Sequence, residues 1–105
     1  MRKIINGKRY DTSKAVEVGS ASGGGAVGDF SHWSATLYRT PRSGQYFLHG
    51  EGGPMTRWSV SIGQNQWAGG EDITPMSRDE AFAWAQEHLE SWEVEEEFAD
   101  LIEDA

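Results

Sequence analysis

The chain has 105 residues, no Cys, five Trp and a formal net charge of −8. This length suits one domain of ordinary size, and its aromatic side chains are numerous enough for a modest core, which excludes wholesale disorder. The lack of Cys excludes disulfides, thiolate metal sites and a Cys nucleophile, and it is typical of the reducing cytoplasm. No apolar run has the length of a signal peptide or a membrane span, so we expect a cytoplasmic protein that does not bind membranes.

The charge is unevenly distributed along the chain. Residues 1–70 contain eight basic and four acidic residues, whereas residues 71–105 contain thirteen acidic residues and one basic residue, Arg78. An acidic surface repels nucleic acid and attracts basic protein surfaces. We therefore expect a basic protein as the partner and no direct binding of nucleic acid. We expect the chain itself to be a monomer.

The first third of the chain predicts a hairpin, a short helix and a loop. Asn6-Gly7 lies between apolar residues and suits the two positive φ values of a type I′ turn, so residues 3–10 are expected to form the hairpin. Asp11 or Thr12 can cap a short helix that Gly19 would end. Residues 20–29 are rich in Gly and Ser, which indicates a flexible loop.

Four segments in the middle of the chain have the composition of β-strands. They are residues 32–40, 45–50, 57–63 and 71–74. Their connections are a turn at residues 41–44, a glycine-rich bend at residues 50–54 and a turn region at residues 64–70. In the third segment Trp58, Val60 and Ile62 alternate with polar residues, which predicts one buried face. Together these segments favour an antiparallel meander of about three to five strands.

The last third predicts two helices. Ser77 and Glu80 form a capping box at the start of the first helix, which is expected to run from Arg78 to about Leu89. Ser91 can cap the second helix, whose apolar residues recur at helical spacing. These are Val94, Phe98, Leu101 and Ile102. The predicted fold class is therefore α+β, with the meander in residues 1–75 and two helices in residues 77–104 packed on it, in a single domain.

The segment "HGEGG", residues 49–53, is the stretch most like an enzyme site. His49 and Glu51 can act as a general base and its partner, and the glycines can bring the backbone close to a ligand. The structural alternative, a glycine-rich bend with a hydrogen-bonded His49, is preferred.

The remaining motifs give little support for catalysis or metal binding. His32, His49 and His88 match no metal-ligand spacing, and no phosphate-binding loop or nucleophile elbow is present, so we expect neither a cofactor nor a metal. The five Trp are expected to lie mostly in the core. Trp67, among Gln and Asn residues, is the best candidate for an exposed contact.

The strongest candidate site is the acidic side of the second helix. The carboxylates expected to face away from the apolar stripe are Glu93, Glu96, Glu97, Asp100 and Asp104. Residues four apart on a helix are about 6 Å apart, which is close to the spacing of phosphates along a nucleic-acid strand. Asp79, Glu87 and Glu90, with Glu71 and Asp72, are expected to widen this surface. The composition fits both a mimic of nucleic acid and a merely solvated face.

Three motifs together resemble a known family. They are "INGKRYDTSKA", "LYRTPRSGQYFLHGEGG" and "ITPMSRDEAFAWAQEHL". They are similar to small proteins of bacteria, phages and other mobile elements, and some of these relatives are anti-CRISPR proteins. The resemblance covers most of residues 4–90 and is not a catalytic signature. It implies inhibition of a CRISPR effector complex in a bacterial host cell.

The resemblance and the charge distribution favour the same hypothesis. CRISPR effectors hold DNA in positively charged channels, which a compact acidic protein can occupy. The leading hypothesis is therefore a non-enzymatic, anti-CRISPR-type inhibitor, with a type I complex as the expected target, that blocks DNA binding by mimicry. The alternatives are a small hydrolase or ligand-binding enzyme centred on His49 and Glu51, or an antitoxin-like binder of a basic protein.

Overall fold

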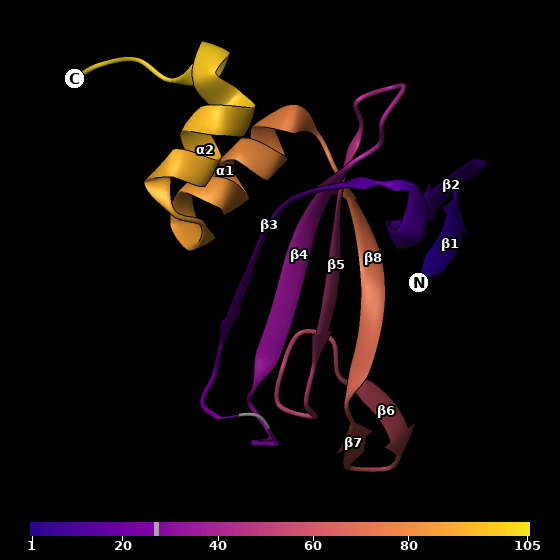
Figure 1. Cartoon of the computed structure of the whole chain (residues 1–105). Coiled ribbons are helices and arrows are strands. Elements are labelled where there is room, and N and C mark those ends of the chain that lie inside the picture. The colour runs from indigo at the N-terminus through magenta and orange to yellow at the C-terminus, as the bar shows by residue number, and fades with distance from the viewer. Residues whose placement is uncertain (27) are drawn as a thin grey trace.

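The computed structural model describes residues 1–26 and 28–105 and has an α+β architecture (Figure 1). The strands are β1 Arg2–Ile5, β2 Lys8–Asp11, β3 Val16–Gly23, β4 Trp33–Arg39, β5 Tyr46–Gly52, β6 Val60–Gly63, β7 Gln66–Ala68 and β8 Gly70–Met76. The helices are α1 Arg78–His88 and α2 Ser91–Phe98, with 3-10 turns η1 Thr12–Lys14 and η2 Ala99–Leu101. Among the described residues, no helix combines the length and apolar character that crossing a membrane requires.

The main sheet is antiparallel, with the strand order β3-β4-β5-β8. The two helices lie on one side of this sheet and the β1–β2 hairpin lies on the other (Figure 1). On the helical side, Leu37 and Leu48 of the sheet pack with Ala81, Ala85 and Phe98 of the helices. These five side chains are at most 2% exposed, so this layer is the main core. The predicted meander with two C-terminal helices packed on it is confirmed.

The β1–β2 hairpin forms as its turn sequence predicts. Asn6 and Gly7 have φ values of 51° and 77°, the left-handed pair that a type I′ turn requires. The hairpin packs Tyr10 against Phe47 and Ile73 on the side of the sheet that the helices leave open. This second, smaller core covers one end of that face.

The predicted helix over residues 11–19 is wrong beyond its first turn. Asp11 does cap a 3-10 turn by accepting a hydrogen bond from the Ser13 backbone N–H, 3.0 Å away. The chain then becomes extended, and β3 pairs with β4 along its length. Long-range strand pairing overrides the local cap here. Part of the predicted loop at residues 20–29 is therefore strand as far as Gly23, and residue 27 of that loop lies outside the described residues.

The predicted glycine-rich bend at residues 50–54 is also wrong in its first half. Strand β5 continues to Gly52, and its register with β4 and β8 is uninterrupted. A Cβ on Gly50 would overlap the Trp58 ring, which lies directly on the backbone at this point. Gly50 therefore makes room for an aromatic ring on a regular strand.

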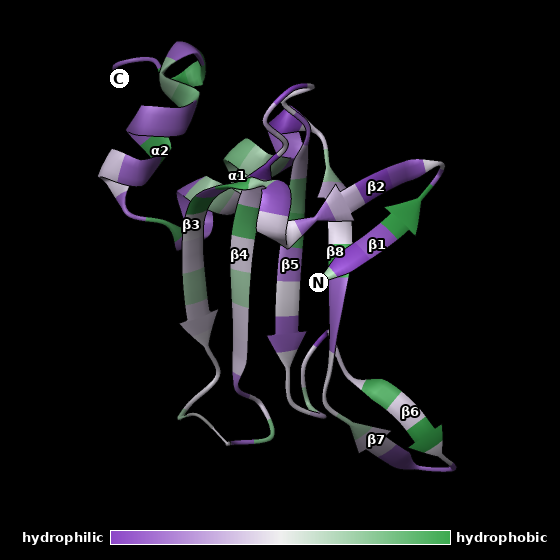
Figure 2. Cartoon of the chain, turned by 45° about the vertical axis from the view of Figure 1, so that its right-hand side comes forward, coloured by the Kyte–Doolittle hydropathy of each residue, from purple (hydrophilic) through white to green (hydrophobic). Residues whose placement is uncertain are grey.

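The alternating segment at residues 57–63 does not join the main sheet. Strand β6 pairs with β7 in a separate hairpin that projects from the end of the molecule away from the helices (Figures 1 and 2). Trp58 is 9% exposed, but Val60 and Ile62 are 47% and 63% exposed. The prediction of one buried face was wrong because a two-stranded hairpin has no second layer to cover its apolar side chains. Trp67, on the same hairpin, is exposed as expected.

The helices begin close to the predicted positions. The Ser77–Glu80 capping box is present at the start of α1. The cap of α2 is Glu90, and Ser91 is the first helical residue rather than the cap. Helical structure ends at Leu101, three residues before the expected end, so Ile102 and Asp104 lie beyond it.

Candidate functional site

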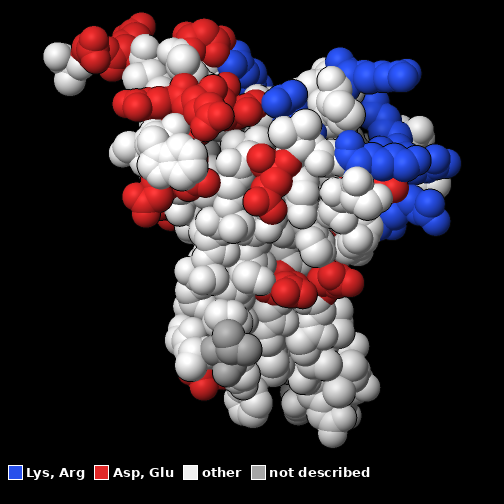
Figure 3. Space-filling model, in the orientation of Figure 1, with Lys and Arg blue, Asp and Glu red and all other residues white. Residues whose placement is uncertain are grey.

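The acidic residues gather at one end of the molecule. In Figure 3, red side chains cluster over α1 and α2, blue side chains cluster at the β1–β2 hairpin, and the opposite end of the sheet is nearly uncharged. The fold thus converts the charge asymmetry of the sequence into a spatial separation. Whether each predicted carboxylate is available to a partner depends on its contacts within the chain.

Glu97 faces the sheet and is not part of an outward row. Its Oε2 accepts hydrogen bonds from Arg39 Nε at 2.8 Å and from the Tyr46 hydroxyl at 2.6 Å. Its side chain is 16% exposed. Burial, followed by the hydrogen bond to Glu97, raises the pKa of Tyr46. Glu97 therefore fastens α2 to strands β4 and β5.

Asp100 and Glu93 also have structural partners. Both carboxylate oxygens of Asp100 accept hydrogen bonds from the Arg78 guanidinium, which lowers the pKa of Asp100 and raises that of Arg78. This pairing ties η2 to the start of α1 and neutralises the one basic residue of this region. Glu93 is half-buried, lies against Gly19 and accepts a hydrogen bond from the Glu90 backbone N–H at 3.2 Å.

Glu71 and Asp72, which were expected to widen the surface, lie on β8 and pair with His49 and Lys3 instead. The other predicted carboxylates are exposed. They are Asp79, Glu87, Glu90, Glu96 and Asp104. Two further exposed carboxylates, Glu95 and Glu103, belong to the same surface and were not predicted from the sequence. Successive helical residues are about 100° apart, so Glu95 and Glu97 flank the buried Val94–Phe98 stripe on opposite sides. A helical projection shows that both Glu95 and Glu97 lie beside the apolar stripe, but it does not show which of them faces the sheet.

We call the set Asp79, Glu87, Glu90, Glu95, Glu96, Glu103 and Asp104 the acidic surface. It draws on both helices and on the segment after η2, so the predicted single row of five carboxylates on one helix does not form. Among the described residues, the side chains of Asp79, Glu95, Glu96 and Asp104 form no hydrogen bond or ion pair.

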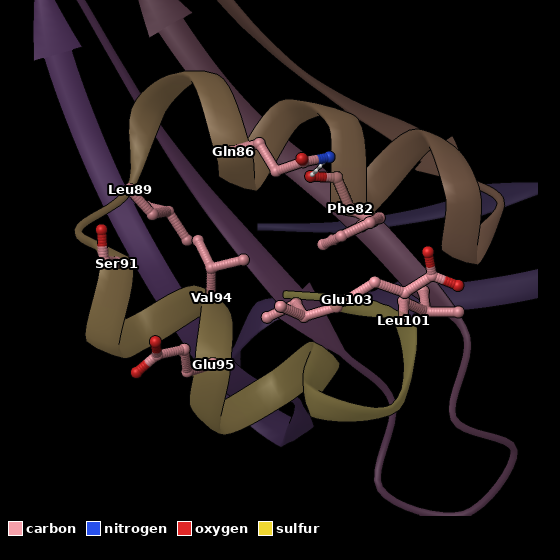
Figure 4. A pocket seen from close by; sticks show the side chains of 9 residues that line it. Phe82, Gln86, Leu89, Ser91, Val94, Glu95, Leu101 and Glu103 are labelled. Carbon is pink, nitrogen blue, oxygen red and sulfur yellow. Dashed lines mark hydrogen bonds between the residues drawn. The ribbon is translucent and has the colours of Figure 1, made fainter. Parts of the chain in front are cut away.

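A groove of about 450 Å³, lined by both apolar and polar side chains, opens within this surface. In Figure 4 the side chains of Phe82, Leu89 and Val94 point toward one another between α1 and α2. Glu95 and Glu103 lie at its border. The groove can take an apolar side chain, and its border can pair with cations next to that side chain.

The other predicted site, His49 and Glu51, lies on the face of the main sheet that the helices do not cover. His49 and Glu51 lie on the same face because β5 is regular, yet His49 Nε2 is bonded to Glu71 Oε2 at 2.9 Å rather than to Glu51. Glu51 pairs with Glu71 of the neighbouring strand β8 and accepts a hydrogen bond from the Ser34 hydroxyl at 3.2 Å. Among the described residues, no group of three or more His, Asp or Glu is arranged to hold a metal ion.

Comparisons of the chain with protein-family models, with curated proteins and with solved structures found no match.

Proposed function

We propose that this protein is a non-enzymatic inhibitor that binds the basic DNA-binding surface of a bacterial DNA-handling complex through its acidic surface. The observation that carries this proposal is the acidic surface, whose carboxylates pair with no Lys or Arg among the described residues. The nearest basic group is His88, whose Nε2 lies 3.8 Å from Glu87 Oε2. Arg78, the one Lys or Arg of this region, is paired with Asp100. An uncompensated acidic surface raises the association rate with a basic surface and repels nucleic acid.

The groove between the helices adds to the electrostatic attraction. Phe82, Leu89 and Val94 offer apolar contact in the middle of a charged surface, with Glu95 and Glu103 at the border. Interfaces commonly combine an apolar centre with a polar rim. A basic segment that carries an apolar side chain fits this arrangement.

The proposed target is a CRISPR effector complex of type I. The choice of target comes from the resemblance of "YFLHGEGG" and its flanking motifs to small mobile-element proteins, some of them anti-CRISPR proteins. CRISPR effectors hold DNA through positively charged channels, which matches the charge of the acidic surface.

Two variants with the same net charge test the proposal. The helix triple is Glu95→Lys, Glu96→Lys and Asp104→Lys, which changes exposed residues without side-chain partners among the described residues. The sheet triple is Glu17→Lys, Glu51→Lys and Glu71→Lys, which leaves the acidic surface intact. Phage plaquing in hosts with different CRISPR systems measures inhibition, and circular dichroism confirms that both variants fold.

We expect that the helix triple no longer protects phage from the CRISPR system and that the sheet triple still does. Loss in the sheet triple alone would overturn it and favour the hydrolase or ligand-binding alternative, because that variant removes Glu51 and the partner of His49. Equal loss or equal retention in both triples would show that the acidic surface is not the determinant. Recovery of a toxin in a host pull-down, instead of an effector complex, would favour the antitoxin-like alternative.

A further inference from the structure

A second cavity lies on the other side of α1 from the groove. Its volume is about 410 Å³, and its lining includes three of the five Trp residues. These residues are Trp33, Trp58 and Trp84. His88 and Glu87, at the end of α1, and Arg57 complete the charged and polar part of its wall. Neither the proposed function nor the sequence motifs account for this concentration of indole rings.

The aromatic wall is held together by ring contacts from separate elements. The rings of Trp33 and Trp58 are 6.0 Å apart between centroids. His88 lies between helix and sheet, 5.5 Å from Trp33 and 4.9 Å from Trp84. Trp58 is 9% exposed and lies on the backbone of Gly50, which fixes its position. The cavity is therefore built before any ligand arrives.

The chemistry of the wall selects a cation. The face of an indole ring carries negative charge density, and cations bind over it. The chain already uses this interaction, because the Arg57 guanidinium lies 4.8 Å from the centre of the Trp58 ring. Glu87 adds a carboxylate whose side chain is 77% exposed and thus accessible, although His88 Nε2 lies 3.8 Å from its Oε2. Arg57 is the cationic part of the lining and already lies over Trp58, so the rings of Trp33 and Trp84 and the Glu87 carboxylate are the groups that remain for a ligand cation.

A planar cation suits the cavity better than a compact one. A guanidinium can stack on an indole and donate two hydrogen bonds to a carboxylate at the same time, which an ammonium group cannot do. We propose that the cavity binds the side chain of an arginine that the partner presents. The claim that the partner supplies the arginine rests on the proposed function, whereas the affinity of the cavity for a guanidinium does not.

The test is an NMR titration of the full chain with a blocked Gly-Arg-Gly peptide. The five Trp indole N–H signals act as separate probes, assigned by single Trp→Phe variants. We expect saturable shifts of the signals of Trp33, Trp58 and Trp84, with roughly millimolar affinity. The signals of Trp67 and Trp92, which are exposed and not part of the lining, should not move. The same peptide with citrulline, which is neutral and similar in shape, should not bind.

Two charge variants locate the binding site. Glu87→Gln is expected to lower the affinity for the peptide about two- to fivefold, as is typical of the loss of an exposed ion pair. Glu95→Gln removes the same charge from the groove on the other side of α1 and should leave the affinity unchanged. Equal binding of the citrulline peptide, equal effects of the two variants, or the absence of saturable shifts would overturn the proposal. The helix triple does not change Glu87. Its effect on phage protection therefore tests the proposed function independently of guanidinium binding in the cavity.

Discussion

The side chain of Glu97 joins the second helix to two strands of the sheet. Its carboxylate accepts hydrogen bonds from Arg39 and Tyr46, and it is largely buried. Such a carboxylate serves the fold because its removal leaves two donors without an acceptor in a partly buried place. Neighbouring Glu96 is exposed and has no such partner among the described residues. Adjacent glutamates in one acidic run thus have different roles.

We predict that Glu97→Ala lowers the free energy of unfolding by about 1–3 kcal/mol, the usual cost of leaving buried polar groups unpaired. Glu96→Ala is the matched control, and it should change stability by less than about 0.5 kcal/mol because it alters an exposed side chain. Urea unfolding of both variants, followed by Trp fluorescence, gives the comparison. Equal midpoints for the two variants would contradict the structural role of Glu97.

Tyr46 makes stability dependent on pH in the alkaline range. Burial, and then the bond to Glu97, raises its pKa above the ordinary value of 10.0. The folded state therefore keeps the phenol proton at a pH where the unfolded chain has begun to lose it, and this contribution to stability disappears as pH rises through the pKa of the folded protein. We predict that stability falls above about pH 10. Tyr46→Phe should flatten this decline in urea unfolding measured across that range, and an unchanged decline would contradict the assignment.

At the scale of elements, the sequence predicts those structures whose determinants are local. The Asn6-Gly7 turn and the Ser77–Glu80 capping box are complete within a few residues, and both form as expected. Strand β3 depends on pairing with β4, and the burial of β6 depends on a second layer that the described part of the chain does not provide. Neither condition can be seen in the local pattern.

The same distinction applies to the candidate site. The concentration of carboxylates in the last third of the chain follows from composition alone. The partner of Glu97 is Arg39, 58 residues away, and the partner of Asp100 is Arg78, 22 residues away. No helical period reports such contacts. The aromatic cavity likewise combines Trp33, Trp58 and Trp84 from three separate segments, so it becomes visible only in the folded chain.

At the scale of the whole molecule, charge and apolar surface are separated along a body of 48 × 35 × 20 Å. The helical end is acidic, and the β1–β2 hairpin is basic (Figure 3). The segment at residues 58–70, which includes the projecting hairpin, contains no charged residue. Net charge alone therefore does not predict how this protein attracts a partner, because a partner that contacts one end of the molecule is affected mainly by the charges of that end. Screening in salt should act mainly on contacts made by the acidic surface.

This separation predicts different behaviour for two proteins of equal net charge. Each charge reversal adds two units, so the helix triple and the sheet triple both move the formal net charge from −8 to −2. If retention depends on the charged surface that faces the resin, the helix triple loses the strongest binding surface and the sheet triple keeps it. On an anion exchanger at pH 7, we predict that the helix triple elutes at a lower salt concentration than the sheet triple. Elution of both triples at the same salt concentration would mean that retention depends on net charge alone and not on where the carboxylates lie. The acidic surface would then give a basic partner no stronger electrostatic attraction than the rest of the protein surface.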